Sequence, residues 1–105
     1  MSLLALSETI KESVTKAGLN GLRFSAISAS DAISNGTEGM RYSLLSREII
    51  ADSVEAVSRN LYYDANITIP ACDKNMPGVL MAHARLNRPG LIVYGGATMT
   101  GRHKG

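Results

Sequence analysis

Tryptophan is absent from this chain, phenylalanine occurs once, and aromatic residues make up only 5% of the 105 positions. Charge is sparse and balanced as well, since charged residues make up 19% of the chain and the formal net charge is +2. Proteins that bind nucleic acid usually combine a basic surface, which neutralises phosphates, with aromatic rings on which bases stack. Because this chain has little of either, we expect no nucleic-acid partner.

Long apolar runs and cysteine pairs are also missing. No apolar run approaches the roughly 18 residues that a membrane-spanning helix needs, and no signal or transit peptide is visible. Cys72 is the only cysteine, so an internal disulfide cannot form. A lone thiol fits a reducing compartment. We therefore expect no membrane association and a location in the cytoplasm or, in a eukaryote, in an organelle matrix.

The chain does contain an alternation of helix-like and strand-like segments. Apolar residues at helical spacing predict helices, and short apolar runs between them predict strands. The predicted helices are Leu6–Ala17 with Ser7 as its cap, a second helix built on Ile50, Val54, Val57 and Leu61 with Ser43 or Ser46 as its cap, and a third from Pro77 to Leu86; the predicted strands are Leu22–Ile27, Ile67–Pro70 and Leu91–Tyr94, with a loop at 32–41. Helices between strands favour right-handed crossovers and a parallel sheet. We predict an α/β fold with three layers, in which a mostly parallel sheet is flanked by helices.

A thiol, a carboxylate and an amine occupy the consecutive positions Cys72, Asp73 and Lys74. Burial of such groups without partners is costly, so they require partners or a ligand. A thiolate suits iron or an iron–sulfur cluster, and a carboxylate suits a hard cation such as magnesium. Ligands of parallel sheets bind beyond the carboxyl ends of the strands. The predicted strands place these three residues there, together with Asp31 and Gly95.

Each of these residues, taken singly, also has an ordinary structural interpretation. A cysteine after a strand is usually a small buried apolar residue. Asp73 and Lys74 could form an exposed ion pair, and Asp31 could cap a turn. His83 and His103 have no second ligand at metal-binding spacing, so we expect both to be structural or surface residues.

Three longer motifs carry more information than the single residues. They read SDAIS at 30–34, CDKNMPG at 72–78, and LNRP at 86–89 followed by VYGG at 93–96. In this order they resemble the dihydroxy-acid dehydratases, in the family that also includes 6-phosphogluconate and sugar-acid dehydratases. The resemblance is continuous from Arg23 to Gly96. The NMPG after the CDK triplet and GTEGMRYSL at 36–44 favour the branched-chain amino-acid enzymes.

The resemblance implies a hydro-lyase that converts 2,3-dihydroxy-3-methyl carboxylates to 2-keto acids in valine and isoleucine biosynthesis. Cys72 matches a cysteine that binds a [2Fe-2S] or [4Fe-4S] cluster, which acts as a Lewis acid on the 3-hydroxyl. Asp31 and Asp73 match magnesium ligands, and Lys74 matches a lysine that is carbamylated and then offers a carboxylate-like oxygen. A small dihydroxy acid is the expected substrate, and the full-length enzyme is expected to be a homodimer.

The length of the chain indicates a fragment. Members of the family are several times longer and use three cysteines for the cluster, of which only the counterpart of Cys72 is present. The family's catalytic serine base and a glutamate ligand of magnesium belong to a C-terminal part that these residues do not include. We therefore expect residues 1–105 to be part of the N-terminal cluster- and magnesium-binding domain, a partial domain that is inactive alone.

Three residues depart from the family pattern without removing a ligand. Ala71 replaces a glycine before the cysteine, Asn35 replaces a common methionine, and His83 replaces an apolar residue. Other functions therefore stay open at this point. The chain could be a non-catalytic magnesium-binding or assembly module, a relative of the sugar-acid dehydratases, or an inert remnant that exposes apolar surface.

Overall fold

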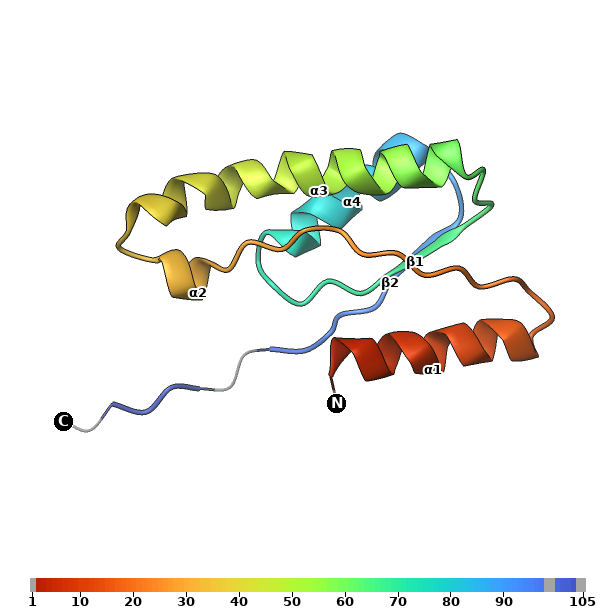
Figure 1. The fold of residues 1–105 in the computed structure, drawn as a ribbon, viewed down its shortest axis with the longest axis horizontal. Helices are drawn as coiled ribbons and strands as arrows, with labels where there is room; N and C mark the ends of the chain where they lie inside the picture. Colours follow the sequence, from red (N-terminus) through yellow and green to blue (C-terminus); the bar gives the residue numbers. More distant parts are fainter. Residues whose placement is uncertain (1, 98–99, 104–105) are drawn as a thin grey trace.

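The computed structural model describes residues 2–97 and 100–103 of the chain. In chain order its elements are α1 (Leu3–Lys16), α2 (Asp31–Ser34), the 3₁₀ helix η1 (Glu38–Met40), α3 (Arg41–Asn60), β1 (Asn66–Thr68), α4 (Asn75–Leu86) and β2 (Gly90–Ile92) (Figure 1). The two strands are parallel, with Ile67 opposite Leu91, and α4 connects them. The prediction of parallel strands joined by a helix is thus confirmed, in a helix-rich chain with a small two-stranded sheet.

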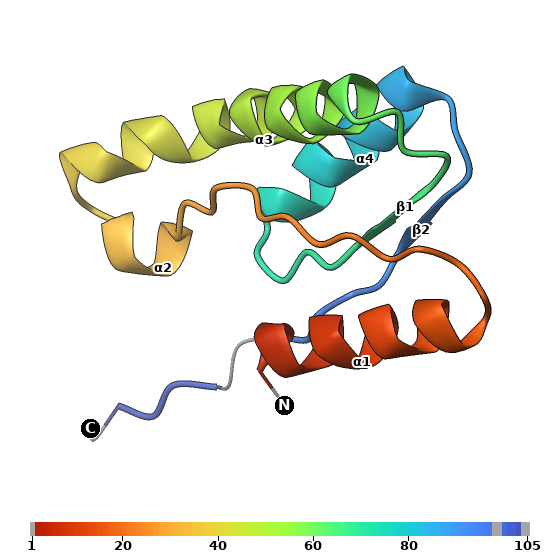
Figure 2. The ribbon, with the colours of Figure 1, turned by 45° about the vertical axis from the view of Figure 1, so that its right-hand side comes forward.

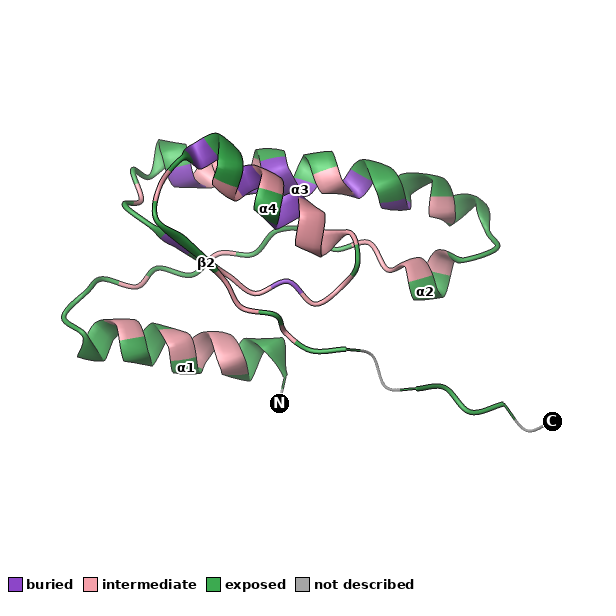
Figure 3. Ribbon diagram, turned by 180° about the vertical axis from the view of Figure 1, so that it is seen from behind, coloured by how far each residue is buried: buried purple, intermediate pink, exposed green. Residues whose placement is uncertain are grey.

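The core lies between α3 and α4. It consists of Ile50, Ala51 and Val54 from α3 and of Val79, Ala82 and Leu86 from α4. Figure 3 shows the buried residues gathered where these two helices face each other. The helices come closest at Gly78, where an added Cβ would lie 2.9 Å from Cγ2 of Ile50. Ile50 and Val54, two of the four residues whose spacing predicted the second helix, therefore lie on the packed face, whereas Val57 is partly buried and Leu61 is exposed beyond the end of α3.

The strands lie between this helix pair and α1. In both views of the ribbon, α3 and α4 lie on one side of the strands and α1 on the other (Figures 1 and 2). Every residue of α1 stays exposed or only partly buried. An apolar groove separates α1 from the strands, and it is lined by Ile10, Val14, Leu19, Ile67, Leu91 and Val93 among others. Burial in this chain is therefore concentrated on one side of the sheet.

Both serine caps predicted from the sequence are wrong. Helix α1 begins earlier than expected, and its cap is Ser2, whose Oγ accepts a hydrogen bond from Ala5 N at 3.2 Å. Helix α3 begins at Arg41, so Ser43 and Ser46 lie inside it and are buried. A cap preference is short-range, and in α3 the burial of one helix face extends the helix through Ser43 and Ser46. In α1 another serine, Ser2, supplies the cap nearer the N-terminus.

The strand predicted at Leu22–Ile27 is also wrong. These residues belong to an irregular stretch that runs past the start of α4, outside the β1–β2 ladder. Side chains hold the stretch instead, since Asn75 Nδ2 donates to Ile27 O at 3.3 Å and Arg23 pairs with Glu8. A strand needs a neighbouring strand for its backbone groups, and apolar composition alone does not supply one.

The loop predicted at 32–41 contains two short helices. Asp31 begins α2, and η1 follows before α3 starts. The two observed strands are shorter than predicted, although Val93 N donates to Thr68 O and Gly95 N donates to Pro70 O, both at 2.8 Å. None of the helices within residues 2–97 is long and apolar enough to cross a membrane.

Candidate functional site

The segment Cys72–Lys74 forms the connection between β1 and α4. The carbonyl oxygen of Cys72 accepts hydrogen bonds from Asn75 N at 3.0 Å and from Met76 N at 3.2 Å. These bonds satisfy amide groups at the start of a helix, which have no partners within the helix itself. Pro77 fits the first turn because a proline there loses no helical hydrogen bond. The loop is therefore held by the strand before it and the helix after it.

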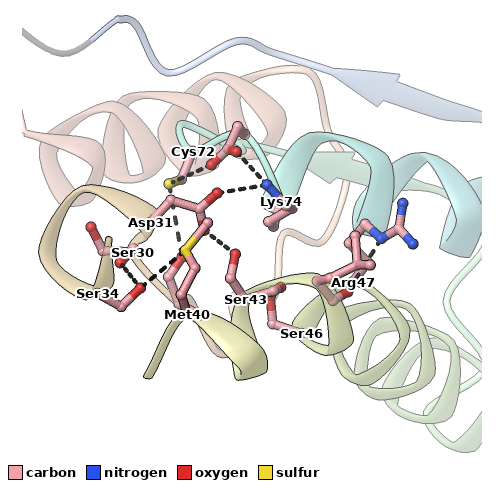
Figure 4. Close-up of polar contacts among 12 residues, drawn as sticks. Ser30, Asp31, Ser34, Met40, Ser43, Ser46, Arg47, Cys72 and Lys74 are labelled. Carbon is pink, nitrogen blue, oxygen red and sulfur yellow. Dashed lines mark hydrogen bonds and ion pairs between the residues drawn. The ribbon is translucent and has the colours of Figure 1, made fainter. Parts of the chain in front are cut away.

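Lys74 brings two carboxylates together. Its Nζ lies 2.6 Å from Oδ2 of Asp31 and 2.5 Å from Oδ2 of Asp73 (Figure 4). The side chains of Lys74 and Asp31 are each 19% exposed, whereas that of Asp73 is 56% exposed. The expectation that these three residues meet at one place is confirmed. We call Asp31, Cys72, Asp73 and Lys74 the CDK cluster.

Asp31 reaches the cluster from a different part of the chain. It is the first residue of α2, and its Oδ1 accepts a hydrogen bond from Ser43 Oγ of α3. Its expected position after a strand is wrong because the strand at Leu22–Ile27 does not form, yet the side chain arrives beside the loop as predicted.

The charges in the cluster stabilise one another. The hydrogen bond from the Lys74 ammonium, reinforced by a weak one from the Cys72 thiol, lowers the pKa of Asp73 from 3.8 to about 2. Hydrogen bonds to Asp31 and then to Asp73 raise the pKa of Lys74 above its ordinary value. At neutral pH Asp73 is therefore an anion and Lys74 a cation.

Cys72 lies at the edge of the cluster and is partly buried. Its thiol donates weakly to Oδ1 of Asp73 at 3.4 Å and to the carbonyl of Ala29 at 3.8 Å. An iron–sulfur cluster requires several ligands, typically four thiolates, and this chain has a single cysteine. The residues of this chain therefore do not hold such a cluster alone, and Cys72 can supply one ligand of it.

The donor atoms fit a hard divalent cation better. Two carboxylate oxygens converge on one positive charge, the Lys74 ammonium, which occupies the position that a cation between them would take. Carboxylate oxygens are ligands that magnesium prefers. Within residues 2–97 and 100–103, no three His, Cys, Asp or Glu side chains lie close enough together to hold a metal ion. A third ligand at this position must therefore come from Lys74 itself, from water or from another chain segment.

The other candidates have structural surroundings. His83 Nε2 lies 3.0 Å from Thr68 Oγ1, and burial lowers the pKa of its imidazole. His103 is exposed. Gly95 donates its amide to Pro70 O, and a Cβ added to it would lie 3.1 Å from Cβ of Ala71. Ala71 thus packs against a glycine next to the loop, which explains how its methyl group is accommodated.

Sequence reasoning missed Ser43 as a partner of Asp31. A signal was present, because Ser43 and Ser46 continue the buried face of Ile50 and Val54 at spacings of three, four and four residues. A serine on a buried helix face needs a hydrogen-bond partner. Such a position predicts a polar contact rather than a cap.

Comparisons with known proteins agree with the motif analysis. Residues 1–105 match the family described as "Dihydroxy-acid/6-phosphogluconate dehydratase N-terminal". The chain is 61% identical over 101 residues to the mitochondrial dihydroxy-acid dehydratase ilvC of Aspergillus fumigatus, with 96% of this chain and 17% of that protein covered. It is 59% identical over 101 residues to the chloroplastic dihydroxy-acid dehydratase of Arabidopsis thaliana, with 96% of this chain and 17% of that protein covered. It is 54% identical over 105 residues to the dihydroxy-acid dehydratase of Cytophaga hutchinsonii, with 100% of this chain and 19% of that protein covered. The chain thus spans less than a fifth of the length of these curated relatives.

Proposed function

The chain belongs to the dihydroxy-acid/6-phosphogluconate dehydratase family, and on this basis we propose that it is part of a hydro-lyase that converts 2,3-dihydroxy-3-methyl carboxylates to 2-keto acids in valine and isoleucine biosynthesis. The observation that carries the proposal is the convergence of Asp31 and Asp73 on Lys74 Nζ, beside the only cysteine of the chain.

In this proposal Asp31, Asp73 and Lys74 hold magnesium. The two carboxylates already face one cation, so they need little rearrangement to bind another. Lys74 becomes a ligand when Nζ forms a bond to the carbon of carbon dioxide and releases protons, because the resulting carbamate is an anion. Magnesium, when bound, supplies positive charge for the carboxylate and the 2-hydroxyl of the substrate.

Cys72 is the proposed thiolate ligand of a [2Fe-2S] or [4Fe-4S] cluster. The remaining thiolates come from other parts of the complete protein, because this chain has one cysteine. The cluster, when bound, would supply a Lewis acid that makes the 3-hydroxyl a better leaving group. The short distance of 3.4 Å between Cys72 Sγ and Asp73 Oδ1 supports a proposal in which two metal groups bind the adjacent hydroxyls of one substrate.

The complete protein is proposed to supply what this chain lacks. Its sheet extends β1 and β2 into a three-layer domain that covers exposed apolar side chains such as Leu91, which is 57% exposed. The base that removes the C2 proton and a further magnesium ligand lie in that remainder. We propose a homodimer, in the cytoplasm or an organelle matrix.

A chimera tests the proposed function. In one of the curated relatives named above, the matching segment is replaced by this chain, and formation of 2-keto acid from 2,3-dihydroxyisovalerate is measured anaerobically. We expect the chimera to be active. A sugar acid assayed in parallel decides between the two branches of the family, since the faster substrate identifies the branch.

Variants of the chimera test the residues. Asp73→Asn should lower turnover by more than the roughly 10–100-fold that loss of an outer partner of a metal ligand costs. Cys72→Ser should also abolish the visible absorption of the cluster. The matched control is Asp64→Asn, an exposed aspartate in the turn after α3, which should leave turnover unchanged. An inactive chimera in an active parent would favour the assembly module or the remnant, and full activity in Asp73→Asn would refute the proposed magnesium site.

A further inference from the structure

The two carboxylate oxygens of Asp31 have different partners. Oδ2 faces Lys74 Nζ at 2.6 Å, whereas Oδ1 accepts a hydrogen bond from Ser43 Oγ. Ser43 is only 1% exposed, so its hydroxyl is shielded from water. One oxygen of Asp31 therefore faces the cation position, and the other is held by the interior of the protein (Figure 4).

Two serines of α3 donate their hydroxyls to side chains of other elements: Ser58 to the neutral amide oxygen of Asn66, and Ser43 to the carboxylate of Asp31. Ser13, Ser46 and Ser53 donate to backbone carbonyls three or four residues earlier in their own helices. This is the usual bond of a serine inside a helix. Ser43 donates instead to a carboxylate of another element, 12 residues away in sequence. A hydrogen bond to a charged acceptor is roughly twice as strong as one between neutral groups.

The backbone of Asp31 has little support of its own. It begins the four-residue helix α2 and follows the irregular stretch before it, whereas Ser43 belongs to the 20-residue helix α3. Of these two helices, α3 contributes buried apolar residues to the core and α2 contributes none. The Ser43–Asp31 bond therefore connects a weakly supported carboxylate to the best-packed part of the chain.

We propose that Ser43 is a positioning residue, which fixes the orientation of the Asp31 carboxylate so that Oδ2 faces the metal position. This inference rests on the proposed function, because it assumes that Asp31 is a metal ligand. Without the hydroxyl, the Asp31 carboxylate can rotate about its terminal bond, and binding a cation then costs the conformational freedom that Ser43 removes in advance.

The test measures metal affinity directly. In the chimera described above, Mn²⁺ replaces magnesium as a probe, because it also prefers oxygen ligands, and bound Mn²⁺ is determined from the loss of the free-ion signal in electron paramagnetic resonance. Ser43→Ala should raise the Mn²⁺ dissociation constant about 10–100-fold, the usual effect of losing an outer partner of a metal ligand. Ser43→Cys, which fills the site with a somewhat larger side chain but offers only a weak donor, should raise it as well.

The matched control is Ser46→Ala. Ser46 lies on the same helix, is 3% exposed, and donates to Ser43 O at 2.6 Å. Its loss removes the same atoms from the same core, so it should lower the unfolding midpoint comparably and leave Mn²⁺ affinity unchanged. Unchanged affinity in both Ser43 variants, or an equal loss in Ser46→Ala, would overturn the inference and leave the magnesium site standing. Failure of the unmodified chimera to bind Mn²⁺ would refute the proposed site and the inference with it.

Discussion

Gly78→Ala is expected to destabilise the α3–α4 pair even though alanine is a better helix former. Gly78 is buried, and a Cβ on it would lie 2.9 Å from Cγ2 of Ile50, 3.0 Å from its Cβ and 3.1 Å from Arg47 O. Contacts this short require one helix to move away from the other. Ile50 is 1% exposed and the Arg47 atom belongs to the backbone, so neither can yield by a simple rotation.

The magnitude follows from two opposing terms. Replacing glycine by alanine inside a helix gains about 0.8–1 kcal/mol. Overpacking of a tight core costs about 1–3 kcal/mol, and the rigid neighbours place this site in the upper part of that range. We therefore expect the free energy of unfolding to fall by about 1–2 kcal/mol. The measurement is a urea titration of the chain followed by far-ultraviolet circular dichroism, with the slope against urea checked for constancy.

A double-mutant cycle isolates the contact. Ile50→Ala removes Cγ2 and should by itself cost about 2–5 kcal/mol. In that background Gly78→Ala should cost less than it does alone, because the nearest atom has gone. A gain of stability on Gly78→Ala alone would refute the reasoning, since it would mean that α3 and α4 are not in close contact at this position.

Three further predictions concern His83, Arg85 and Cys72. Burial lowers the pKa of His83 below 6.5, so the unfolded chain binds the proton more readily than the folded chain does. The contribution of His83 to the free energy of unfolding is therefore complete above about pH 6.5 and falls as the pH drops below it. Urea titrations should show this loss in the native chain but not in His83→Gln. Arg85 of α4 contacts Asp52 at 2.6 Å and Glu48 at 3.0 Å, both in α3, so Arg85→Met should lower the urea midpoint. A difference in midpoint between the variant and the native chain that stays unchanged in high salt would contradict this electrostatic account. Anaerobic incubation of the chain with iron and sulfide should give no stable visible absorption band, because a lone thiolate does not complete a cluster; a stable band that Cys72→Ser abolishes would show that chains combine their cysteines.

The helices and the Cys72–Lys74 part of the CDK cluster could be predicted because their signals are local. Pro77 and Pro89 bracket α4 closely, so its predicted start was within two residues and its end was correct. Cys72, Asp73 and Lys74 are adjacent in the sequence, so no tertiary reasoning was needed to place them together. Parallel pairing of the two later strands followed from the helix that connects them.

The remaining features depend on contacts that a sequence does not display. Leu22–Ile27 has the composition of a strand but lies outside the ladder, because pairing depends on a neighbour at the right position. Ser43 was interpreted as a cap because serine favours helix starts, yet its hydroxyl is directed to Asp31 in another element. The local preference of serine indicates that the Ser43 hydroxyl forms a hydrogen bond, but it does not identify Asp31 as the partner.

The position of Lys74 between two carboxylates makes the folding of this segment independent of the magnesium that we propose for it. Two like charges would repel each other in a chain that had to wait for an ion, but here the chain brings its own counter-charge on a side chain 2.5 and 2.6 Å from them. The polypeptide can therefore reach its shape before the proposed magnesium binds. The charge that neutralises Asp31 and Asp73 during folding is thus supplied by a residue of the chain rather than by an ion from solution.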